Sequence, residues 1–208
     1  MLPIESLIPF IVASALLAIA PGPDNIFVLT QSTLYGKRSG ILITLGLCTG
    51  LIFHTSLVAL GVATLLQTSG WAFEALKITG AVYLLYLAWQ LLKTPLQRLH
   101  GDNVALSDSA LYIRGIIMNI TNPKVSIFFL AFLPQFADPG FGPVPPQILL
   151  LGAVFGLLSL LIFSAIATVA ARIGHWLQQQ PSIQLHLNRL TALIFVLLAL
   201  NLLLSSAV

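Results

Sequence analysis

The stretch from Ile41 to Leu66 contains no Asp, Glu, Lys or Arg. As a helix it is longer than the roughly 20 residues that cross the hydrocarbon core of a bilayer. The whole chain shares this character, because only 7% of its 208 residues are charged, against about 25% in an ordinary soluble domain. A soluble fold needs more charged side chains to cover its surface. The composition therefore excludes a soluble enzyme, a nucleic-acid-binding protein and a disordered chain, and indicates an integral membrane protein.

Apolar segments recur along the chain and predict an all-α membrane protein with six transmembrane helices. Short polar sequences interrupt the first segment at Pro21–Asn25 and the fourth at Asn122–Lys124. Ser107 or Asp108 is expected to cap the start of the fourth segment. The six segments cover about 7–35, 41–66, 73–92, 111–133, 147–171 and 190–207.

Basic residues are concentrated in alternate loops. Most of the 9 Lys and Arg residues follow the first, third or fifth segment. Because cytoplasmic loops of membrane proteins carry an excess of Lys and Arg, these three loops are expected in the cytoplasm and both termini on the outer side. The residues that set this orientation are Lys37, Arg38, Lys93, Arg98, Arg114, Arg172 and Arg189.

The two halves of the chain, 1–100 and 101–208, resemble each other. Pro23-Asp24 in the first segment matches Pro123-Lys124 in the fourth. Each half holds three segments, an odd number, so the second half enters the membrane in the opposite orientation. This pattern predicts a 3+3 inverted repeat, an architecture common among secondary transporters. Chance similarity between apolar helices is the alternative.

A GxxxG motif also occurs at matching places in the two halves, in the second and fifth segments. Small residues at this spacing let membrane helices approach closely. They are expected to pack the two halves together or to support a homodimer. The residues concerned are Gly46, Gly50, Gly152 and Gly156.

The first segment cannot form one straight helix. Pro21 and Pro23 lack a backbone donor, and Gly22 between them is conformationally permissive. Residues 7–20 as a helix extend about 21 Å, which is less than the ~30 Å of hydrocarbon. A second half-helix is therefore expected to begin at Asp24 and Asn25. Irregular backbone at membrane depth is tolerated only inside protein or beside water, so the interruption is either a ligand site or a purely structural kink.

Asp24 and Lys124 are the two charges placed deepest in the predicted membrane segments. Each costs about 2.5–3.5 kcal/mol at a helix centre on insertion scales. We expect them to compensate each other where the two halves meet. Two roles stay open: a structural ion pair, or a site in which Asp24 binds a proton or an ammonium group and Lys124 acts as its counter-ion or binds a carboxylate.

The interruptions supply the other candidate binding residues for substrate and protons. The asparagines either bind substrate or repair the interrupted backbone, and His54 is either a proton relay or a packing residue. No nucleotide-binding, hydrolase or metal-ligand motif is present in the sequence, so we expect no catalytic activity, cofactor or metal. The candidate set is Pro21, Gly22, Pro23, Asp24, Asn25, Asn119, Asn122, Pro123 and Lys124.

Four motifs in order resemble the LysE/RhtB family of amino-acid exporters: Ala20-Pro-Gly-Pro-Asp-Asn25, the glycine-rich second segment, Asn122-Pro-Lys124 and Phe132-Leu-Pro-Gln-Phe136. The resemblance covers essentially the whole chain. It implies a carrier in the bacterial cytoplasmic (inner) membrane that exports neutral or basic amino acids by proton antiport. Pro21-Gly-Pro23 is similar to the neutral-substrate branch, whereas an acid at Asp24 favours a cationic substrate.

Two other functions are compatible with the composition. A cation or metal exporter of the same superfamily would use acidic clusters in the membrane, and this chain offers one deep acid with a neighbouring lysine. The other is a protein that transports nothing, either an intramembrane enzyme or a structural subunit. Neither predicts amino-acid flux.

Overall fold

The computed structural model describes residues 4–20, 22–62, 70–93 and 106–178, together with scattered positions between 185 and 203. Every regular element in these residues is a helix, which confirms the all-α prediction. Most of the predicted sixth segment and the loop at 94–105 lie outside the described residues. The elements in order are α1 (Ile4–Ile19), α2 (Pro23–Tyr35), α3 (Lys37–Leu57), η1 (Val58–Val62), α5 (Gly70–Lys93), α6 (Asp108–Ile120), α7 (Pro123–Ile127), η2 (Phe128–Phe132), η3 (Leu133–Phe136), η4 (Pro139–Phe141) and α8 (Val144–Gln178).

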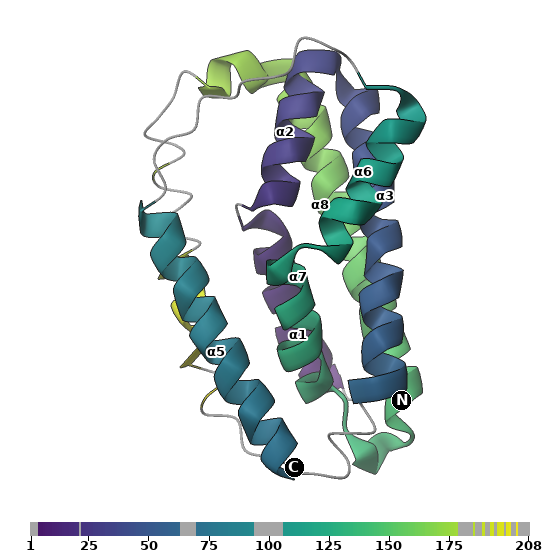
Figure 1. Ribbon diagram of the computed structural model, residues 1–208, viewed down its shortest axis with the longest axis vertical. Coiled ribbons are helices and arrows are strands. Elements are labelled where there is room, and N and C mark those ends of the chain that lie inside the picture. The colour runs from purple at the N-terminus through teal and green to yellow at the C-terminus, as the bar shows by residue number, and fades with distance from the viewer. Residues whose placement is uncertain are drawn as a thin grey trace.

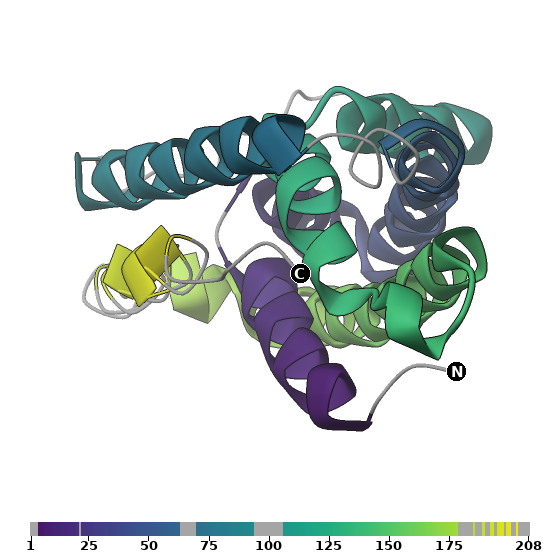
Figure 2. The ribbon, with the colours of Figure 1, turned by 90° about the horizontal axis from the view of Figure 1, so that it is seen from below.

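The helices run roughly along one long axis (Figure 1). α3 packs against both α6 and α8, and α8 also packs against α1 and α2. α5 stands at the side of this group, as the view from below shows (Figure 2), where it contacts α7 and η2. The group α1, α2, α3, α6 and α8 therefore surrounds the interior in which the candidate residues lie.

Two helix pairs are bent at the predicted interruptions. Leu7–Ile19 and Pro23–Tyr35 meet at 56°, and Asp108–Ile120 and Pro123–Phe136 meet at 48°. In each pair a proline occupies the first turn of the second helix, where its missing N–H costs nothing and its fixed φ suits a helix start. The same ring would clash inside a continuous helix, so the chain ends one helix and begins another.

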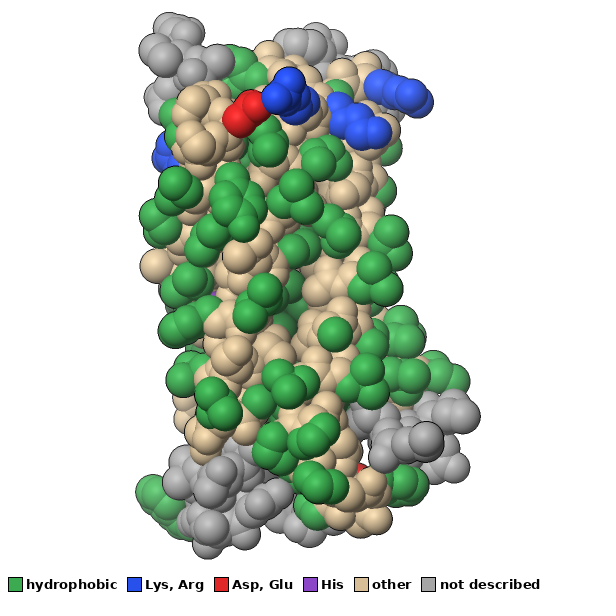
Figure 3. Space-filling model, turned by 90° about the vertical axis from the view of Figure 1, so that its right-hand side faces the viewer, with side chains coloured by type: hydrophobic (Ala, Val, Ile, Leu, Met, Phe, Trp, Pro, Cys, Tyr) green, Lys and Arg blue, Asp and Glu red, His purple; other side chains and the backbone are tan. Residues whose placement is uncertain are grey.

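Two straight stretches, Lys37–Gly61 and Val144–Arg172, are long and apolar enough to cross a bilayer, and each bent pair adds one span if it crosses as a unit. Their outward side chains are apolar, and apolar side chains cover much of the face shown in Figure 3. Ile52 on α3 and Leu161 on α8 are 64% and 60% exposed. Soluble proteins rarely expose such extensive apolar surface, so these faces contact lipid.

Charged side chains gather at one end of the molecule (Figure 3). There Arg38, at the start of α3, forms an ion pair with Asp108, at the start of α6. The Ser107 side chain accepts a hydrogen bond from the Ala110 N–H at 3.3 Å, so of the two residues expected to cap this helix Ser107 is the cap.

Close helix contacts occur at the glycines of the first GxxxG motif. A Cβ atom added at Gly46 would lie 2.1 Å from the Tyr112 carbonyl oxygen and 3.0 Å from the Gly115 Cα atom. A Cβ atom at Gly50 would lie 2.7 Å from the Cβ atom of Asn119. Glycine in α3 therefore lets it approach the backbone of α6 from the other half of the chain.

The second GxxxG motif is used only in part. A Cβ atom at Gly152 would lie 2.3 Å from the Thr55 Cγ2 atom, so this glycine sits against α3. A Cβ atom at Gly156 would meet no described atom within 4 Å. The two matching motifs therefore differ in packing at their second glycine.

Buried apolar side chains form two clusters. The larger cluster draws on α1, α3, η1, α5, α7, η2, η3 and α8, and includes Phe10, Leu17, Phe128, Phe129, Phe132 and Phe155. The smaller cluster draws on α2, α3, α6 and α8, and consists of Val28, Ile43, Leu47, Leu111, Phe163 and Ala167.

Gly46→Ala is expected to destabilise the protein, because the new methyl group meets backbone that cannot rotate away. Overpacking of this kind costs about 1–3 kcal/mol, and each kcal/mol lowers Tm by about 2–4 °C at this size. Gly156→Ala is the matched control, since its methyl group meets open space. Thermal unfolding of both detergent-purified variants tests this, and equal Tm values would contradict the close α3–α6 contact.

Candidate functional site

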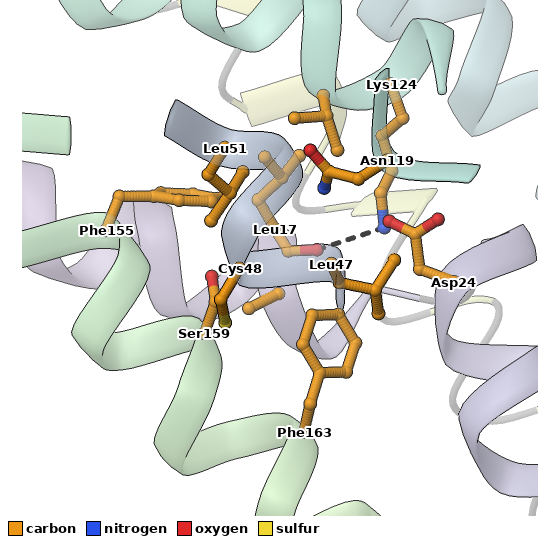
Figure 4. A pocket seen from close by; sticks show the side chains of 12 residues that line it. Leu17, Asp24, Leu47, Cys48, Leu51, Asn119, Lys124, Phe155, Ser159 and Phe163 are labelled. Atoms are coloured by element: carbon orange, nitrogen blue, oxygen red, sulfur yellow. Dashed lines mark hydrogen bonds between the residues drawn. The ribbon is translucent and has the colours of Figure 1, made fainter. Parts of the chain in front are cut away.

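A small pocket lies where the two clusters meet. The space open to the centre of a water molecule is about 10 Å³, which holds a single water. Its walls combine side chains of the larger cluster with side chains of the smaller one, and Figure 4 shows polar groups of Asp24, Asn119, Lys124 and Ser159 among them. The lining residues are Leu17, Ala18, Asp24, Leu47, Cys48, Leu51, Asn119, Lys124, Val125, Phe155, Ser159 and Phe163.

The Lys124 ammonium binds the end of α1. Lys124 is 5% exposed, and its Nζ donates to the carbonyl oxygens of Leu17 at 3.2 Å and Ala20 at 3.0 Å. The last carbonyls of a helix lack partners within it and carry the negative end of its dipole. An ammonium with three donors therefore suits this position, and the contact joins the second half of the chain to the first.

The predicted direct ion pair between Asp24 and Lys124 is not formed. Both residues are described by the structure, and no ion pair within 4.0 Å joins them. The physical reason is competition: the interrupted α1 offers two carbonyl oxygens to the same ammonium. The two side chains still point into one pocket (Figure 4) and act on each other electrostatically.

Asp24 lies in the first turn of α2 and is 2% exposed. The positive end of the α2 dipole favours a carboxylate at this place. Nevertheless, no hydrogen bond from a described residue reaches its Oδ1 atom. Lys124 and His54 act on this carboxyl group through their charges, and the Asn122 side-chain amide acts on it as a nearby hydrogen-bond donor. A buried carboxyl oxygen without a partner, beside a pocket, is available to a proton or a ligand.

Two asparagines repair the interrupted backbone. The Asn25 Nδ2 atom donates to the Ala18 carbonyl oxygen at 2.7 Å and the Ile19 carbonyl oxygen at 3.3 Å. The Asn122 Oδ1 atom accepts from the Lys124 backbone N–H at 3.0 Å and caps α7. Both side chains thus bond the interrupted backbone, while the Asn25 Oδ1 and Asn122 Nδ2 atoms are buried without a hydrogen-bond partner among the described residues, so the binding role stays a prediction.

Asn119 differs from the other two asparagines, because its side chain faces the pocket. Its Oδ1 atom is buried and no described residue hydrogen-bonds to it. Its backbone carbonyl oxygen lies 3.1 Å from the His54 Nε2 atom. Since a carbonyl only accepts, the ring nitrogen donates this bond. The His54 ring also packs against the Phe129 ring, with 5.7 Å between the centroids.

The two interruptions therefore share one arrangement. The C-terminal carbonyls of α1 bind a nitrogen of Lys124 from the second half, and a carbonyl at the end of α6 binds a nitrogen of His54 from the first half. The sequence pointed to both side chains, but not to these backbone partners. Each half holds the end of the other half's interrupted helix.

The other candidates frame the site. Gly22, with extended backbone at φ −168° and ψ 175°, leaves room for the Lys124 ammonium, since a Cβ atom there would lie 3.0 Å from Nζ. Pro23 and Pro123 begin α2 and α7, and Pro21 lies outside the described residues. The apolar walls escaped sequence reasoning because the whole chain is apolar. Ser159, a 2% exposed polar residue in an apolar helix, offered the one available signal.

The apolar surface, bent helix pairs and buried charges define a membrane protein with a polar site inside its bundle. Residues 15–206 match the family model for LysE type translocators. The chain belongs to this family, which confirms the resemblance seen in its motifs. Its fold and family mark it as a membrane translocator.

Several relatives cover nearly the whole chain. A homoserine/homoserine lactone efflux protein of Salmonella typhimurium is 35% identical over 90% of this chain and 91% of its own. An uncharacterized membrane protein of Vibrio cholerae is 30% identical over 90% and 91%, and a leucine efflux protein of Enterobacter is 28% identical over 90% and 90%. No solved structure matches the chain.

Asn25→Ala is expected to destabilise the protein by about 1–3 kcal/mol, because it leaves the buried Ala18 carbonyl without its side-chain donor. Thr121→Ala is the matched control at the other interruption, where an exposed side chain bonds the Ile117 carbonyl, which keeps the Thr121 backbone N–H as a donor at 2.9 Å. The Tm of each purified variant measures the difference. A Thr121→Ala loss as large as that of Asn25→Ala would contradict the repair role.

Proposed function

We propose that this translocator exports neutral amino acids from the bacterial cytoplasm in exchange for protons. The relatives named for homoserine and leucine efflux support this substrate class. The pocket supports it as well, since Asp24 alone is acidic among the described residues that line it. One carboxylate balances the α-ammonium of an amino acid and leaves no partner for a cationic side chain.

The observation that carries the proposal is the state of Asp24. A carboxyl group that is 2% exposed inside a membrane bundle is costly to ionise unless a cation accompanies it. The Asp24 carboxyl group is therefore suited to being ionised while an ammonium group is bound and protonated while none is bound. Exchange of these two partners at one carboxyl group couples amino-acid exit to proton entry.

The proposed cycle uses the two halves, 1–100 and 101–208, as the moving parts of a six-helix inverted repeat. Ionised Asp24 binds the substrate ammonium from the cytoplasm, and the halves then expose the site to the outside. A proton replaces the substrate there, and the carrier with the neutral Asp24 carboxyl group turns its site back to the cytoplasm. Pocket walls such as Leu47, Phe155 and Phe163 meet the substrate side chain.

We also propose that both termini lie outside the cytoplasmic membrane. The basic end of the molecule supports this orientation (Figure 3), because Lys37 and Arg38 at the start of α3 are exposed there. Positively charged ends of membrane helices lie preferentially in the cytoplasm. The larger cluster then lies on the outer side of the pocket and the smaller cluster on the cytoplasmic side.

Asp24→Asn is expected to abolish transport driven by a pH gradient, because an amide neither ionises nor carries a proton. Purified protein in liposomes loaded with a panel of labelled amino acids provides the assay. Asp108→Asn is the matched control, since this carboxylate lies at the exposed end and pairs with Arg38; its transport should equal that of the unmodified protein.

Two results would contradict the proposal. If Asp24→Asn transports normally in a pH gradient, Asp24 does not carry the proton. If the unmodified protein moves no amino acid of the panel under any gradient, the chain is not an amino-acid exporter.

A further inference from the structure

We propose that the Lys124 ammonium occupies the binding site of the substrate's α-ammonium group and takes its place when the carrier is empty. This inference rests on the proposed function, and it assigns the amine subsite to the carbonyl oxygens of Leu17 and Ala20 together with Asp24. Lys124 is then an internal substitute for the substrate.

The first argument is chemical identity. The side chain of Lys124 and the backbone end of a free amino acid both present a primary ammonium group with three donors. The Leu17 and Ala20 carbonyl oxygens, 3.2 Å and 3.0 Å from Nζ, are acceptors that suit either one. The adjoining Asp24 carboxyl oxygen without a partner supplies the negative charge that a substrate ammonium requires.

The second argument is space. The pocket next to the Lys124 ammonium has room for about one water molecule, so an amino acid does not fit beside this ammonium in the present conformation. Gly22 also limits the space around this ammonium, because a Cβ atom at Gly22 would lie 3.0 Å from the Lys124 Nζ atom and 3.3 Å from its Cε atom. A substrate that reaches the carbonyls has to displace the lysine.

The third argument concerns the closed state. Closing the protein around bare helix-end carbonyls would bury acceptors without donors, which is unfavourable. With substrate bound, its ammonium satisfies them; without substrate, Lys124 does. The absence of a direct contact between Lys124 and Asp24 agrees with a return step in which a protonated Asp24 needs no cation.

The test measures two modes of transport by the Lys124→Met variant in liposomes, net efflux and exchange, with labelled L-homoserine and L-leucine. Net efflux requires the empty carrier to close and return, whereas exchange at equal concentrations on both sides moves a loaded carrier in both directions. We expect Lys124→Met to lose net efflux and to keep exchange within about twofold. Lys37→Met, at an exposed lysine of α3, is the matched control and should keep both.

Binding provides a second readout in detergent. A site filled by Lys124 nine-tenths of the time carries about a tenfold affinity penalty. Lys124→Met should therefore bind L-homoserine about tenfold more tightly, and N-acetyl-L-homoserine, which lacks the ammonium, should gain nothing. Lys124→Arg keeps the charge, but its planar guanidinium is too large for the space beside Gly22, so it should also lose net efflux more than exchange.

Each outcome decides the inference. Net efflux by Lys124→Met at the level of the unmodified protein, equal loss of efflux and exchange in both variants, or weaker binding by Lys124→Met would overturn it. In these cases the unmodified protein still transports, so the proposed function stands. If the unmodified protein neither exchanges nor exports any amino acid, the proposed function fails and this inference fails with it.

Discussion

The bond between the Lys124 ammonium and the end of α1 is the interaction on which the site depends. It satisfies carbonyl oxygens that the interruption after Ile19 leaves without helical partners. It also links the two halves of the chain at the depth where water is scarce. The same ammonium lines the pocket and acts electrostatically on Asp24.

The polar groups form a thin layer between two apolar clusters. Residues of both clusters line the pocket, for example Leu51 and Phe155 from the larger and Leu47 and Phe163 from the smaller. Asp24, Asn119 and Lys124 lie in this layer. Each cluster contains residues from both halves of the chain, so this layer lies across the contact between the halves.

Sequence reasoning predicted the helical class, the positions of both interruptions and the residues at the pocket's polar wall. These followed from strong local constraints: proline ends helices, and charges are scarce enough in this chain to stand out. It failed at the partner of Lys124, because the acceptors are backbone carbonyls, which every residue carries and no sequence pattern marks. The apolar walls at Leu47 and Phe163 were equally hidden among similar residues. The two matching GxxxG motifs also differ, since a Cβ atom added at Gly156 would meet no described atom within 4 Å, whereas one at Gly50 would meet Asn119.

Among the described residues one apolar cluster is larger than the other, and in the proposed transport cycle this difference favours opening on the side of the smaller cluster. Opening toward the cytoplasm separates the smaller cluster of α2, α3, α6 and α8, whereas opening to the outside separates the larger cluster with its stacked phenylalanines. In the proposed orientation the resting protein therefore keeps its thicker apolar seal against the exterior. Under the proposed exchange of amino acids for protons, this seal separates Asp24 from the outer solution.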